Sequence, residues 1–92
     1  MIVGVLTLEL FFPHARSLKD KRRILHGFKD RVRRQNVALA VLDFQDLWQR
    51  SRLGVVTLNS QAAVVEEVLG RVLAEACGLP EAEVAGHEVH YV

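Results

Sequence analysis

SLKDKRRILHGFKDRVRR, residues 17–34, is the stretch around which the rest of the chain is organised. Its hydrophobic residues are spaced seven, three and four apart: Leu18, Leu25, Phe28 and Val32. This spacing predicts an amphipathic helix with one face in the core. Ser17 followed by Asp20 predicts the helix start, because the hydroxyl can accept from the Asp20 amide and the carboxylate favours the positive helix end.

Residues 16–34 also carry most of the positive charge. They hold nine of the twelve Lys and Arg residues and only two Asp, a formal charge of +7, whereas residues 60–92 carry −5. Most of the basic side chains project within one arc of roughly 140°. This basic arc consists of Lys19, Arg22, Arg23, Lys29, Arg33 and Arg34. We expect Asp30 to pair with Arg34 at i,i+4. Lys21 falls within the hydrophobic face, so it must snorkel or find a carboxylate.

Length and composition indicate a soluble globular protein. The 92 residues are expected to form one domain, residues 1–92, with a core large enough to fold. The only cysteine, Cys77, excludes an intrachain disulfide and is expected to be a small buried hydrophobic residue. The N-terminus lacks the features of a signal peptide, and residues 2–10 are too few to span a bilayer. We therefore expect a cytoplasmic protein that does not contact membranes.

Four segments predict β-strands. Residues 2–12 are rich in Val, Ile, Leu and Phe on both faces, which is typical of a central strand. Residues 37–44 and 52–58 predict two more strands, connected by residues 45–51. In residues 82–91, hydrophobic and polar residues alternate sufficiently to predict the fourth strand.

A second helix is predicted between the last two strands. Asn59 or Ser60 is expected to cap it, and it should run to about Cys77 before Gly78 and the following proline stop it. The first helix is expected to end at Asn36 in the left-handed conformation.

The predicted element order is βαββαβ. Two βαβ units with right-handed crossovers give a four-stranded antiparallel sheet with both helices on one face. This is the ferredoxin-like sandwich, an α+β fold. The other face of the sheet is then left open or packs on a partner, and Val3, Val5 and Phe11 would lie on it.

Two short motifs resemble those of the YlxP-like family, small bacterial proteins classed as a domain of unknown function (DUF503). The motifs are SLKDKRR at residues 17–23 and DLWQR at residues 46–50, with Leu53–Gly54 soon after. The resemblance covers essentially the whole chain and implies a ferredoxin-like fold with no assigned enzyme activity. Family genes commonly lie beside genes for translation initiation and ribosome maturation, which implies a connection with RNA or the ribosome. A glutamate common on the family's second strand is replaced here by Val41.

The basic arc is the leading candidate for a functional surface. Clustered Lys and Arg side chains gain affinity for phosphate backbones through counterion release, without reading a sequence. The alternatives are a solvated face and a site for an acidic protein partner.

The segment from Asp46 to Arg50 is the second candidate. Trp48 could stack on a base or anchor a partner, with Arg50 and Arg52 supplying charge. We expect instead that Trp48 packs into one end of the core, as a lone Trp in a small domain commonly does. Asp46 is expected to form an ion pair with Lys21 or Arg50.

An anion site before the first helix and a metal site are two further possibilities that the residues allow us to weigh. Arg16 and Ser17 precede a helix N-terminus, where an anion is favoured, and acylphosphatases of this topology hold a phosphate at the equivalent turn. The loop has no glycine to bring its amides close to a phosphate, and topology alone does not imply catalysis. The histidines lack a ligand-spaced set, so neither a metal nor another cofactor is expected.

These observations predict a non-enzymatic cytoplasmic protein that binds RNA or a ribonucleoprotein, related to the ribosome or translation, through the first helix. One alternative is a structural homo-oligomer, such as a homodimer, that associates through the open sheet face. A small phosphohydrolase with its anion site at the loop before the first helix is the other.

Overall fold

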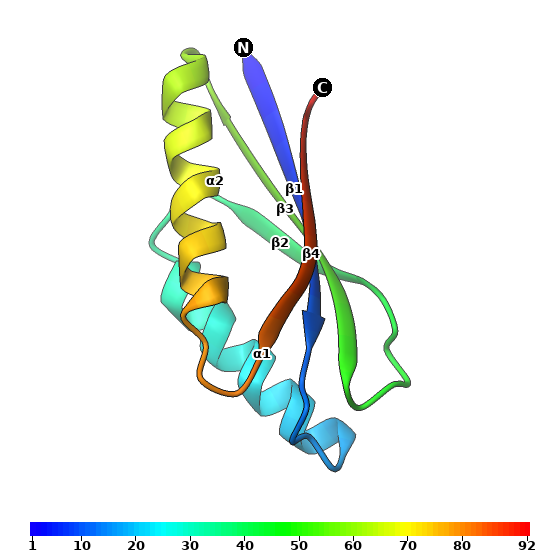
Figure 1. Ribbon diagram of the computed structural model, residues 1–92. Helices are drawn as coiled ribbons and strands as arrows, with labels where there is room; N and C mark the ends of the chain where they lie inside the picture. The colour runs from blue at the N-terminus through cyan, green and yellow to red at the C-terminus, as the bar shows by residue number, and fades with distance from the viewer.

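The computed structural model describes all 92 residues and has the predicted order of strands and helices (Figure 1). The six elements are β1 (Ile2–Phe11), α1 (Leu18–Val32), β2 (Ala38–Asp43), β3 (Arg50–Asn59), α2 (Ala62–Cys77) and β4 (Glu83–Tyr91). The strands form one sheet in the order β2-β3-β1-β4, and all neighbouring strands are antiparallel. Both helices lie on the same face of this sheet (Figure 1). The α+β ferredoxin-like fold is therefore confirmed.

Strand β1 is the central element of the sheet. It pairs with β3 along its whole length and with β4 from Gly4 onward. Its inward side chains are fully buried beneath the helices: Leu6, Leu8, Leu10 and, just beyond the strand, Phe12. They join inward residues of α1, β3 and α2 in one hydrophobic core. Burial of this apolar surface is the main favourable contribution to folding.

Strand β3 begins two residues earlier than the sequence predicted. Arg50 pairs with Phe11 and Ser51 with Leu10, so the antiparallel ladder extends to the end of β1. The connection between β2 and β3 therefore spans only residues 44–49, which we call the β2–β3 loop.

The helix ends differ in detail from the prediction. Ser17 does cap α1, because its hydroxyl accepts from the Asp20 amide at 3.1 Å. The predicted end of α1 is wrong, since Arg33 is the C-cap residue in a right-handed conformation and Asn36 is not left-handed. The predicted cap of α2, Asn59 or Ser60, is also wrong, because Gln61 is the N-cap residue and makes no side-chain cap hydrogen bond. The Asn59 side chain instead accepts from the Gln61 amide.

Cys77 is exposed, which contradicts the expected buried position. The buried residues of α2 end with Ala76, so the next residue along the helix points away from the core. Neither helix is long and apolar enough to cross a membrane.

Candidate functional site

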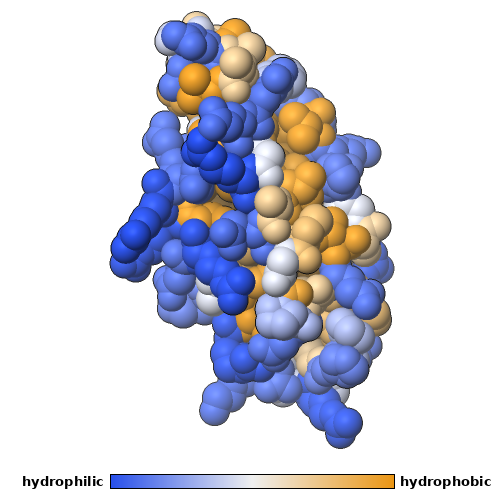
Figure 2. Space-filling view, turned by 60° about the vertical axis from the view of Figure 1, so that its left-hand side comes forward, coloured by the Kyte–Doolittle hydropathy of each residue, from blue (hydrophilic) through white to orange (hydrophobic).

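The basic arc lies on the outer side of α1 and on the turn that follows it, because Arg33 and Arg34 come after Val32, the last residue of the helix. The six residues of the arc are all exposed, whereas Ile24, Leu25, Phe28 and Val32 face the core from the opposite side of the helix. Figure 2 brings the side that bears the helices forward and shows hydrophilic residues over much of it, beside a band of hydrophobic residues. The predicted segregation of charge and core on α1 is therefore present.

Most of the basic arc lacks a carboxylate partner. Four of its six residues have no carboxylate oxygen within 4.0 Å: Lys19, Arg22, Lys29 and Arg34. The two exceptions are Arg33, which lies 3.9 Å from Asp30, and Arg23, whose guanidinium donates to both oxygens of Glu81 at 3.1 and 2.7 Å. This contact lowers the pKa of the Glu81 carboxyl.

Asp30 pairs differently from the prediction. Its carboxylate lies 3.9 Å from the guanidinium of Arg33 and 3.9 Å from the imidazole of His26, and not within ion-pair distance of Arg34. At the C-terminal end of α1, Asp30, Arg31, Arg33 and Arg34 line an open hollow of about 400 Å³. Three guanidinium groups thus border this hollow, and the single carboxylate of Asp30 neutralises only part of their positive charge.

The start of α1 is hydrogen-bonded within the chain. The Arg16 amide donates to the Asp20 carboxylate at 3.0 Å, and the Ser17 hydroxyl accepts from the Asp20 amide. Asp20 therefore occupies the position at which a bound anion would be favoured. The Arg16 side chain is exposed and has no carboxylate partner.

Lys21 neither snorkels to solvent nor finds a carboxylate. Only 3% of the residue is exposed, and its ammonium donates to backbone carbonyl oxygens of the β2–β3 loop and of Arg50, the first residue of β3. The acceptors are Phe44 at 2.7 Å, Leu47, and Arg50 at 3.2 Å, with Gln45 at 3.5 Å. Burial lowers the pKa of Lys21, the nearby Arg22 lowers it further, and Asp46 opposes the shift. A buried ammonium with several carbonyl partners fixes the backbone of the loop around it.

The prediction that Trp48 plugs the core is wrong. Trp48 is 52% exposed and its neighbour Leu47 is 46% exposed. Phe12 and Phe28, both fully buried, supply the aromatic packing of the core, and Lys21 lies beneath the loop. The predicted ion pair of Asp46 is also wrong, since Lys21 bonds to carbonyls and Arg50 pairs with Glu9.

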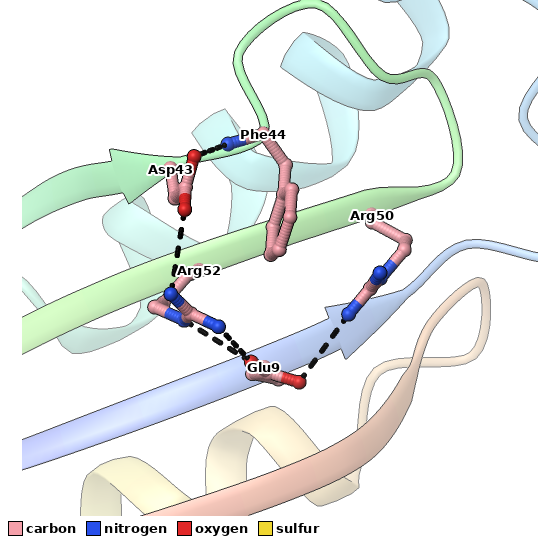
Figure 3. Close-up of polar contacts among 5 residues, drawn as sticks. All are labelled: Glu9, Asp43, Phe44, Arg50 and Arg52. Carbon is pink, nitrogen blue, oxygen red and sulfur yellow. Dashed lines mark hydrogen bonds and ion pairs between the residues drawn. The ribbon is translucent and has the colours of Figure 1, made fainter.

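Arg50 belongs to a group of residues on the open sheet face that sequence reasoning did not assemble (Figure 3). We call this group the sheet-face cluster: Glu9, Asp43, Phe44, Arg50 and Arg52. One Glu9 oxygen accepts from the Arg52 guanidinium, and the other lies 3.6 Å from Arg50. Asp43 contacts Arg52 at 3.3 Å. Both guanidinium groups lie against the Phe44 ring, at 4.3 and 5.1 Å from its centre, as cation–π contacts.

The sheet-face cluster borders a hollow on the surface of the molecule. Thr7, Glu9, Arg52, Gly86, His87 and Glu88 line this hollow of about 520 Å³. The Arg52 contact holds the pKa of the Glu9 carboxyl below its ordinary value, with Arg50 adding to the effect. Glu9 is therefore an ion-pair partner and a weak base. The signal in the sequence was the spacing of Arg50 and Arg52, which places both on one face of a strand.

Comparison with known proteins agrees with the motifs at residues 17–23 and 46–50. The model of the family described as "Protein of unknown function (DUF503)" matches residues 3–89. A curated relative, "Uncharacterized protein YlxP" of Bacillus subtilis (strain 168), is 35% identical over 83 residues, which cover 89% of this chain and 90% of the relative. The chain therefore belongs to the DUF503 family.

Two solved structures share the fold at low identity. The de novo designed protein Foldit4 is 17% identical, with a TM-score of 0.59 over 100% of this chain and 97% of the designed one. A C-terminal segment of the alpha subunit of aIF2 from Pyrococcus abyssi is also 17% identical, with a TM-score of 0.51 over 100% of this chain and 49% of that one. At such identity these likenesses describe the fold alone.

Proposed function

We propose that this member of the DUF503 family is a non-enzymatic protein that binds RNA or a ribonucleoprotein particle through the basic arc of α1. The observation that carries the proposal is the set of four arc residues, Lys19, Arg22, Lys29 and Arg34, that are exposed and have no carboxylate partner. Such side chains can contact phosphates without first breaking an ion pair. Each phosphate contact releases condensed counterions, which gives affinity without sequence readout.

Three arginines of β3 and α2 differ from Arg22 and Arg34 of the arc, which have no carboxylate partner. Arg50, Arg52 and Arg71 each lie within ion-pair distance of a glutamate, although all three are on the surface or partly exposed. The chain has eleven acidic residues, so carboxylates are not scarce. If the basic arc were only a solvated face, we would expect its residues to form ion pairs with these carboxylates as often as these three arginines do. The uneven distribution favours an anionic partner for α1.

The family resemblance and the state of the carboxylates add support. The family resemblance implies a connection with the ribosome and translation, and on that expectation we propose ribosomal RNA as the ligand. Glu9 and Glu81, which border hollows, are both held by arginine and have lowered pKa values, so neither is suited to act as a general base. We do not extend the proposal to phosphate hydrolysis, because Asp20 occupies the start of α1.

A salt-dependent RNA titration tests the proposal. The variant Arg22→Gln, Lys29→Gln and Arg34→Gln removes three charges while keeping long side chains and helix propensity. Its affinity should fall about tenfold or more, and its salt slope should flatten by about 2 to 3 units, since each phosphate contact adds about 0.7 to 0.9. The control carries Arg71→Glu and Ala63→Glu on α2, which changes net charge equally. Equal binding by both variants would contradict the proposal.

A second candidate function rests on the open sheet face. Leu42 is 53% exposed and Leu58 is 48% exposed on the strands β2 and β3, near the partly exposed Val3 and Val5 of β1. Exposed hydrophobic residues grouped in this way are typical of an interface. Leu58 lies opposite Val3 with Val5 opposite Val56, and these residues favour a homo-oligomer, such as a homodimer, associated through this face.

A further inference from the structure

We infer that the RNA recognised by α1 contains unpaired bases and that one of them stacks on Trp48. This inference rests on the proposed function and names the class of its ligand: a single-stranded segment or loop, in place of a continuous duplex. It follows from the exposure of Trp48, from the way its loop is held, and from the position of that loop beside α1.

Trp48 is an exposed aromatic side chain on a fixed loop. The ammonium of Lys21 donates to the carbonyl oxygens of Phe44, Leu47 and Arg50. Phe44 is the first residue of the loop, Leu47 directly precedes Trp48, and Arg50 follows the loop as the first residue of β3. Phe44 has a φ of 65°, a left-handed conformation that few bulky residues adopt, and its carbonyl is one of these acceptors. A loop held in this way presents Trp48 with little ordering cost on binding.

The β2–β3 loop lies beside the N-terminal half of α1. Lys21 comes from α1 itself, so its contacts place the loop next to the first turns of the helix. Gln49 also ties the loop to the segment before α1, since its side chain donates to the Pro13 carbonyl at 3.3 Å and its carbonyl accepts from the Phe12 amide at 2.9 Å. The unpaired cations nearest to this junction in the sequence are Arg16, Lys19 and Arg22.

The combination of an exposed aromatic with adjacent unpaired cations suits single-stranded nucleic acid. Proteins that bind such strands stack bases on aromatic side chains while Lys and Arg follow the backbone. In a duplex the bases are stacked on one another, and their faces are not available to a tryptophan. The cations along α1 would therefore contact phosphates, while Trp48 would contact a base where the strand is unpaired.

Intrinsic fluorescence reads this contact directly, because Trp48 is the only tryptophan in the chain. The probes are a mixed-sequence single-stranded RNA of about 12 nucleotides, a length within the usual site size, and a duplex of the same length. The single strand should quench Trp48 fluorescence and the duplex should not. Trp48→Ala should weaken binding of the single strand by about 5- to 150-fold, the range found for loss of one base–aromatic stack, and change duplex binding little.

Two further variants separate stacking from other uses of the loop. Trp48→Phe keeps an aromatic face and should recover part of the affinity, whereas Leu47→Ala removes the neighbouring exposed side chain and should change nothing. If Leu47→Ala weakens binding as much as Trp48→Ala, the loop makes a hydrophobic contact, as with a protein partner, and the inference is wrong. Circular dichroism should show that all three variants fold, since both residues are exposed.

Different results would overturn the Trp48 stacking inference and the proposed RNA binding by α1. RNA binding that depends on Arg22, Lys29 and Arg34, with no change in Trp48 fluorescence and no effect of Trp48→Ala, would overturn the inference alone. Absence of binding to either RNA at low salt would overturn both.

Discussion

Replacing Lys21 with Met tests whether its ammonium holds the β2–β3 loop in place. Met has a similar length and keeps the apolar stem that packs within the hydrophobic face of α1, so the substitution removes chiefly the charge and its hydrogen bonds. Lys21 is 3% exposed and has three carbonyl acceptors within 3.2 Å, from Phe44, Leu47 and Arg50. The loop should therefore lose its internal support while the core remains intact.

The expected loss of stability is the difference between two opposing effects. Hydrogen bonds to a charged group contribute about 1.5 to 3 kcal/mol each, so three of them stabilise by about 4 to 9 kcal/mol. Burial of an ammonium costs several kcal/mol, on the order of half of that gain or more. Water can also reach the exposed loop and satisfy some of the released carbonyls. We expect Lys21→Met to lower the free energy of unfolding by about 2 to 4 kcal/mol, most of which reflects the unpaired carbonyls.

Urea denaturation followed by far-ultraviolet circular dichroism measures this loss. Lys29→Met is the matched control, because Lys29 lies exposed on the same helix and its replacement should change stability by less than about 0.5 kcal/mol. Tryptophan fluorescence of folded Lys21→Met should in addition show a more mobile Trp48. If Lys21→Met is as stable as wild type, or more stable, the ammonium does not hold the loop and the reasoning is refuted.

Three other outcomes follow from the same structure. Trp48→Ala should lower the free energy of unfolding by less than about 1 kcal/mol because Trp48 is half exposed, and a loss typical of a buried aromatic in denaturant melts would contradict this. Arg52 lowers the folded-state pKa of Glu9 below 4.5, so the pair stabilises the fold above pH 4.5 and is lost as pH falls through the folded-state pKa. Glu9→Gln should therefore show a smaller loss of stability on acidification in thermal melts than wild type. Sedimentation should show self-association at micromolar concentration that Leu58→Glu abolishes, and a concentration-independent wild-type monomer would exclude a sheet-face interface.

Much of the fold could be predicted from the sequence because its signals are local and periodic. The hydrophobic spacing from Leu18 to Val32 predicted a helix, and the hydrophobic run at residues 2–12 predicted a central strand. The right-handed crossover rule then left few ways of arranging two βαβ units. The exposed positions of Lys19, Arg22, Arg23 and Lys29 followed from the same helical projection, although α1 ends before Arg33 and Arg34. These parts depend on residue type and spacing alone.

The parts that could not be predicted depend on contacts between distant segments. Lys21 binds backbone carbonyls 23 to 29 residues away. Because every residue has a backbone carbonyl, residue type does not show which ones accept a hydrogen bond. A lone Trp in a small domain predicts a core position, but Trp48 is exposed on a loop whose backbone is held by Lys21, a contact that residue type does not reveal. The sheet-face cluster required the pairing register of β1 with β3, which brings Glu9 opposite Arg52.

The most direct test of an RNA-binding α1 is to follow every backbone amide by NMR during titration with a ribosomal RNA fragment at low salt. We predict that the largest shift changes fall within residues 18–34, around Lys19, Arg22, Lys29 and Arg34, and that they reverse as salt is raised. Shift changes concentrated on α2 or on the open sheet face, or a spectrum unchanged by RNA, would contradict it.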